Sequence, residues 1–114
     1  MTYKDVRRIG LSFSTVEEGT SYGTSAMNVG KTLFVRLREE GDVIALPMPF
    51  EQREAMMAED PEAYFITDHY LKYEYMLVRL TKVKEKALRD LLMGAYHEAL
   101  KKKPSTRRAR PRAT

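Results

Sequence analysis

The strongest periodic pattern in the chain lies near its end, and it limits the possible folds most. Six apolar or aromatic residues recur there at helical spacing: Leu88, Leu91, Leu92, Ala95, Tyr96 and Ala99. This spacing predicts an amphipathic helix over residues 84–100 with a single apolar stripe. Such a helix must bury its stripe against another layer, and we expect it to cover one face of a sheet.

That sheet is predicted by short runs that are rich in aromatic and β-branched residues or that alternate between apolar and polar side chains. Its clearest strand covers residues 32–38, where successive side chains point to opposite sides. One side carries Leu33, Val35 and Leu37, and the other carries Thr32, Phe34, Arg36 and Arg38. Further strands are predicted at residues 26–29, 43–46, 64–66 and 75–78. Short links between consecutive strands indicate antiparallel pairing.

Two more helices complete the predicted fold. Thr2 and Asp5 fit a capping box at the start of a helix over residues 3–12. A second helix covers residues 50–59, whereas the Ser-, Thr- and Gly-rich residues 14–25 read as a loop. We therefore predict a two-layer α+β domain with an antiparallel five-stranded sheet and helices on one face. The other face is expected to be open to solvent.

Composition and charge divide the chain into two parts. A length of 114 residues suits one domain, which we place at residues 1–100. Residues 101–114 hold seven basic and no acidic side chains, and we expect them to form a disordered basic tail. The remaining 13 basic and 16 acidic residues give residues 1–100 a charge of −3. The overall charge of +4 is therefore a property of the tail.

Several function classes are unsupported by this sequence. The chain has no cysteine, which excludes disulfides, thiolate nucleophiles and cysteine-ligated metals. Residues 1–12 are charged and lack an apolar run, so we expect no signal peptide and a cytoplasmic protein. No segment approaches the roughly 20 apolar residues of a membrane span, and we expect no membrane association. We also expect a monomer without metal or cofactor.

Short segments spread over residues 3–100 together resemble the MmcQ/YjbR family of small bacterial proteins. The segments are residues 5–9, 16–23, 29–37, 53–55, 60–62, 65–70 and 77–80. The resemblance implies a CyaY-like or secretion-chaperone-like α+β fold. It also implies DNA as a candidate partner, because the family is often labelled DNA-binding by structural analogy.

The predicted open face and the tail offer one candidate site for nucleic acid. The face would carry Phe34, Arg36, Arg38 and Arg79, which can hold phosphates by charge and a base by stacking. The alternative is a solvated polar face with its arginines paired to neighbouring carboxylates. The tail contributes Lys103, Arg107, Arg108 and Arg110 to this candidate site. The alternative is that the tail does not bind nucleic acid and only keeps the protein soluble.

An aromatic loop offers a second candidate site, for a small ligand or a protein partner. It would be formed by Tyr22, His69, Tyr70 and Tyr73. Asp68 beside His69 is the minimum for acid–base chemistry, but adjacent residues of an extended segment point to opposite sides. We find no catalytic constellation and predict a non-enzymatic protein. DNA binding is the first functional hypothesis, and a ligand- or protein-binding module without DNA affinity in the folded body is the alternative.

Overall fold

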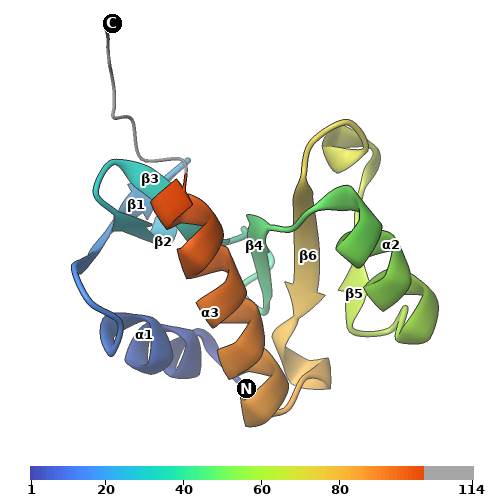
Figure 1. The fold of residues 1–114 in the computed structure, drawn as a ribbon. Coiled ribbons are helices and arrows are strands. Elements are labelled where there is room, and N and C mark those ends of the chain that lie inside the picture. Colours follow the sequence, from blue (N-terminus) through green and yellow to red (C-terminus); the bar gives the residue numbers. More distant parts are fainter. Residues whose placement is uncertain (102–114) are drawn as a thin grey trace, which may run out of the picture.

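The computed structural model describes residues 1–101 and confirms an α+β fold (Figure 1). Its elements are α1 (Tyr3–Leu11), β1 (Val16–Ser21), β2 (Thr24–Val29), β3 (Thr32–Leu37), β4 (Val43–Pro47), α2 (Phe50–Glu59), β5 (Tyr64–Phe65), η1 (Asp68–Tyr70), β6 (Tyr75–Arg79), η2 (Leu80–Lys82) and α3 (Glu85–Lys101). The three predicted helices and five predicted strands all occur, with ends that agree to within two residues.

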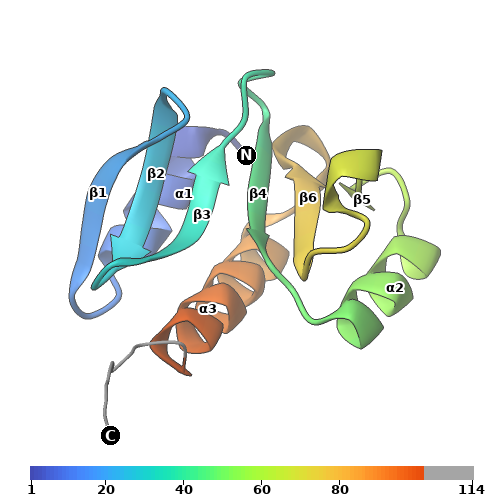
Figure 2. The ribbon, with the colours of Figure 1, turned by 90° about the horizontal axis from the view of Figure 1, so that it is seen from above.

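The sheet has six antiparallel strands in the order β1-β2-β3-β4-β6-β5 (Figure 2). The prediction of five strands was wrong because residues 16–21, read as a loop, form the edge strand β1. Most of β1 is exposed, so its side chains carry no apolar signal, and backbone pairing with β2 defines it. A two-residue turn with positive φ at Tyr22 (54°) and Gly23 (81°) joins these strands, as a tight hairpin requires.

A bulge in β3 overturns the predicted position of Phe34. Met27 pairs with Val35 and Asn28 pairs with Leu33, which leaves Phe34 as an extra residue without a partner in β2. The bulge breaks the strict alternation on which the prediction depended. Phe34 is fully buried in the main core and lies against Phe13 and Tyr96, with ring centroids 6.5 and 5.9 Å away. It therefore cannot stack with a base on an open face.

The main core lies between the sheet and the helices α1 and α3, which contact each other on one face of the sheet (Figure 1). The apolar stripe predicted at the end of the chain is buried, as expected. Val6 and Ile9 of α1 join the same core. Helix α2 adds Met56 and Met57 as partly buried contacts. Burial of these apolar side chains is the main force that stabilises this face of the sheet.

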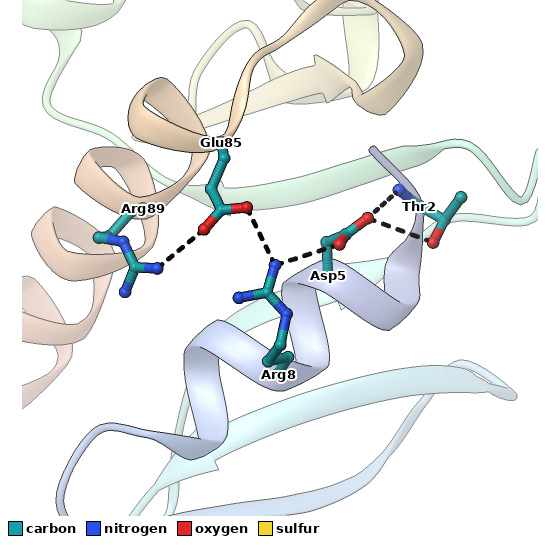
Figure 3. A network of polar contacts seen from close by, with 5 residues as sticks. All are labelled: Thr2, Asp5, Arg8, Glu85 and Arg89. Carbon is teal, nitrogen blue, oxygen red and sulfur yellow. Dashed lines mark hydrogen bonds and ion pairs between the residues drawn. The ribbon is translucent and has the colours of Figure 1, made fainter.

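A polar network ties α1 to α3 at the edge of the core (Figure 3). Arg8 donates from Nη2 to Asp5 and to Glu85, at 3.2 Å each, and Arg89 donates to the other Glu85 oxygen at 3.1 Å. Asp5 also accepts the backbone N–H of Thr2 at 2.9 Å, which confirms the predicted capping box. Hydrogen bonds from the Thr2 backbone and from Arg8 lower the pKa of Asp5. Hydrogen bonds from Arg8 and Arg89 lower the pKa of Glu85.

The opposite face of the sheet is not the bare polar surface that we predicted. Val43, Ala45 and Leu77 form a second apolar cluster there, against which Phe65, Tyr70 and Tyr75 pack. The segment 66–74 between β5 and β6 supplies Tyr70, which caps this cluster. A smaller apolar and aromatic layer therefore covers this face of β4 and β6.

No helix within residues 1–101 is both long enough and apolar enough to cross a lipid bilayer.

Candidate ligand-binding site

A cavity of about 450 Å³ opens on the face of the sheet opposite α1 and α3. Residues from the β1–β2 turn, from β3, β4 and β6, and from the η1 segment line it: Ser21, Tyr22, Leu33, Arg36, Ala45, His69, Tyr70, Tyr73 and Tyr75. All four residues that we predicted for a ligand pocket therefore surround one cavity. A second hollow of about 280 Å³ shares Tyr22, Arg36, His69 and Tyr70 with it and adds Arg38, Glu39 and Thr67.

Tyr22 reaches this cavity from the tip of the β1–β2 hairpin. Its side chain is 86% exposed, which is unusual for an aromatic residue without a partner surface. Its left-handed backbone conformation is also uncommon for a residue other than glycine. The ring lies over the guanidinium of Arg36, with Cζ 5.1 Å from the ring centroid. Tyr22 thus projects a flat apolar surface over the cavity at the cost of backbone strain.

The other aromatic rings come from the segment around η1 and from β6. His69 meets Tyr70 edge to face at 4.9 Å and Tyr73 at 5.9 Å, and Tyr70 lies 6.1 Å from Tyr75. Burial is the main cause that raises the pKa of Tyr75, with smaller contributions from Tyr70 and Tyr22. These rings form a continuous aromatic wall, and a flat ligand can stack against it.

Arg53 of α2 holds the segment that carries this wall, a role that no local sequence pattern indicates. The side chain is only 2% exposed, although it is charged. Its Nη1 donates to the carbonyls of Tyr70, Tyr73 and Tyr75 at 2.8–3.0 Å, and its Nη2 donates to Leu71 at 3.3 Å. These partners are 17 to 22 residues away in sequence, so no local pattern could have revealed them. Arg53 is therefore a positioning residue for the cavity.

A family model described as YjbR matches residues 11–98. The chain belongs to the YjbR family. A comparison with curated proteins finds no match.

Among solved structures, this YjbR-family chain is similar to the crystal structure of protein DR2400 from Deinococcus radiodurans. The TM-score is 0.77 at 21% identity, over 90% of this chain and 80% of that one. At this level of identity, the likeness shows a shared fold only. The CyaY-like and secretion-chaperone-like comparisons stay predictions.

The arginines predicted for nucleic-acid contact do not form one free basic surface in this YjbR-family protein. Arg36 is 8% exposed, and its Nη1 donates to Thr24 Oγ1 at 2.9 Å and to the Leu37 carbonyl at 3.2 Å. Arg79 donates to the Glu62 carbonyl at 2.8 Å and lies 3.9 Å from the centroid of the Phe65 ring, outside the cavity. Arg36 is therefore not displayed outward as the prediction required, whereas Arg79 is partly exposed but held by its own chain. With Phe34 in the core, the predicted four-residue set is divided among three environments.

Arg38 lines the smaller hollow, as Arg36 does, and lies over Tyr70, with Cζ 5.8 Å from the ring centroid. The predicted tail residues Lys103, Arg107, Arg108 and Arg110 lie outside the described residues. Within residues 1–101, no group of three or more His, Asp or Glu side chains is arranged to hold a metal ion. The site thus combines aromatic stacking surfaces with arginine side chains, which is a chemistry of binding.

Proposed function

We propose that this protein is a non-enzymatic binding module that holds a small planar ligand in the cavity between the β1–β2 turn and η1. The observation that carries the proposal is the convergence of Tyr22, His69, Tyr70 and Tyr73 on one cavity from segments 47 to 51 residues apart. Stacking against such rings contributes about 1–3 kcal/mol per planar group in nucleobase complexes. The size of the cavity, about 450 Å³, is in the range of small-molecule sites.

The ring contacts of His69 support a binding role over a catalytic one. Its imidazole faces Tyr70 and Tyr73, and no hydrogen bond joins it to a carboxylate or to a hydroxyl among the described residues. A general base is normally oriented by such a partner and lies within reach of a nucleophile. In this proposal, His69 serves as one more flat wall of the site. The monomeric state and the cytoplasmic location stay predictions.

The test is an NMR titration of the full chain with benzamide and with adenosine, two neutral planar probes. We expect shifts of residues around the cavity, and we expect Tyr22→Ala to weaken binding roughly tenfold because one stacking surface is lost. Tyr22 is exposed, so the variant should fold normally. Leu71→Ala is the matched control, since Leu71 is exposed in the segment that carries His69 and Tyr73 but does not line the cavity. If neither probe shifts the cavity residues, the proposal is wrong.

DNA binding is the second candidate, and the seven basic residues among positions 101–114 are the observation that favours it. The folded body contributes less, because Arg36 and Arg79 are engaged with their own chain. DNA affinity should be measured over a salt series for the full chain and for a chain that ends at Leu100. We expect the truncation to abolish most of the affinity and to flatten the salt dependence. Undiminished binding by the shorter chain would instead assign DNA contact to the body.

A further inference from the structure

Arg38 is in an unusual electrostatic position at the edge of the candidate site. Among the arginines of residues 1–101, it alone makes no side-chain hydrogen bond. Its Nε and Nη1 are shielded from solvent without a partner, although its side chain is 18% exposed. A shielded donor without an acceptor costs about 1–3 kcal/mol, and more when the group is charged. Such a group therefore needs an explanation.

The nearest charge to Arg38 is a weak substitute for a true partner. Glu40 Oε1 lies 3.5 Å from Arg38 Nε, but the pair does not have the geometry of a hydrogen bond. Glu40 belongs to the turn after β3, and its side chain is 46% exposed. Exposed ion pairs of this kind contribute little to stability. The carboxylate can therefore swing into solvent when a better-placed anion arrives.

We infer that the ligand of this cavity carries an anionic group, a carboxylate or a phosphate, which Arg38 binds in place of Glu40. The inference rests on the proposed function, because the planar part of the ligand occupies the aromatic wall. Arg38 Nη2 is not among the nitrogens that are shielded from solvent, so an anion can reach it. Such an anion also accepts a hydrogen bond from a second N–H group of the same guanidinium. Arg36 lines both hollows and adds positive charge beside this position.

The positions of Arg38 and Tyr70 also indicate that one ligand carries both the anionic group and the planar ring. Tyr70 lies under the Arg38 guanidinium, and its ring is also a wall of the larger cavity. Tyr22 and His69 likewise border both hollows. A planar ring among these aromatic side chains therefore has its substituent directed toward Arg38. The ligand class is a small aromatic acid or a mononucleotide.

Two matched pairs of probes test the inference: benzoate against benzamide, and AMP against adenosine. We expect the anionic member of at least one pair to bind about tenfold more tightly than the neutral member. If the preference for the anion occurs only between benzoate and benzamide, the anionic group is a carboxylate. If it occurs only between AMP and adenosine, the anionic group is a phosphate. Equal binding within both pairs overturns the inference but leaves the proposed function intact. If no probe binds, the proposed function is wrong and the inference fails with it.

Variants with opposite expected effects separate recognition from misfolding. Arg38→Gln should remove the preference for the anionic probe and leave the neutral probe unchanged. Glu40→Gln should tighten anion binding severalfold, because it removes the internal competitor, and a misfolded protein would not show this gain. Arg79→Gln is the control, since Arg79 lies on the same face but lines neither hollow. An equal loss of anion preference in Arg79→Gln, or none in Arg38→Gln, would overturn the assignment of Arg38.

Discussion

The two faces of the sheet are built by different chemistry. The face under α1 and α3 buries aliphatic side chains and Phe34 in a continuous core, with ion pairs only at its margin. The opposite face has a cluster of only three buried apolar residues, surrounded by aromatic rings and arginines. Apolar burial stabilises the first face, whereas cation–π contacts and hydrogen bonds to carbonyls organise the second.

This difference separates stability from binding within one small domain. A close-packed core has one arrangement and tolerates little change. The aromatic face keeps an exposed Tyr22, an Arg38 guanidinium without a hydrogen bond and a segment held by one arginine. Tyr22 and Arg38 add little to stability, and they are the groups that a ligand can use. Substitutions on the two faces should therefore affect different measurements.

The largest expected effect is on the helix-covered face. Phe34→Ala should lower the free energy of unfolding by about 3–5 kcal/mol, because a large and fully buried ring leaves a cavity between Phe13 and Tyr96. Urea unfolding followed by circular dichroism measures the change. Tyr22→Ala is the comparison on the other face and should change stability by less than about 0.5 kcal/mol. If Phe34→Ala lowers the free energy of unfolding only slightly, its ring does not lie in the core, and the two faces do not differ in the way described.

Arg53 is expected to link stability and binding on the aromatic face. Arg53→Met removes the guanidinium donor from four carbonyls and should destabilise the protein by about 3 kcal/mol. The backbone amides of residues 70–75 should also exchange faster with solvent, and benzamide binding should weaken. Normal exchange in this segment, together with normal binding, would show that Arg53 does not position the site.

Two glycines in helices should respond to alanine in opposite directions. Gly94→Ala should stabilise α3 by about 0.5–1 kcal/mol, because a Cβ there meets no atom within 4 Å. Gly10→Ala gains the same helical propensity but puts its Cβ 2.5 Å from Met27 Cε and 2.7 Å from Sδ. Met27 is fully buried, so overpacking of about 1–3 kcal/mol should outweigh the gain and destabilise α1. Thermal unfolding of both variants measures the two changes in stability. If Gly10→Ala stabilises the protein, Met27 and the core around it adjust to the added methyl group.

The smallest expected effect concerns the polar network at the margin of the core. The folded protein lowers the pKa values of Asp5 and Glu85 below their unfolded values of 3.8 and 4.5. Their contribution to stability is therefore present above about pH 4.5 and is lost as the pH falls through the folded pKa values. Arg8→Gln should reduce this acid dependence in urea unfolding between pH 7 and pH 3. An unchanged pH profile would mean that the network does not contribute to stability.

Much of this fold was predictable from local patterns. The stripe of α3, the capping box of α1 and the strands β2 to β6 depend on periodicity and on short-range contacts, and the structure confirms them. Strand β1 was missed because an exposed edge strand needs only backbone hydrogen bonds, which side-chain patterns do not record. Phe34 was assigned to the wrong face because one bulge shifts every side chain on one side of it.

The amino-acid order established the fold class, the amphipathic last helix and the concentration of tyrosines around residues 64–80. Only packing in three dimensions brought Tyr22 and His69 to one cavity, inserted Arg53 among the carbonyls of residues 70–75, and left the Arg38 guanidinium without a hydrogen bond. The physical reason is distance along the chain. Local periodicity reports which way a side chain faces within its own element, whereas a binding site depends on which distant elements meet there.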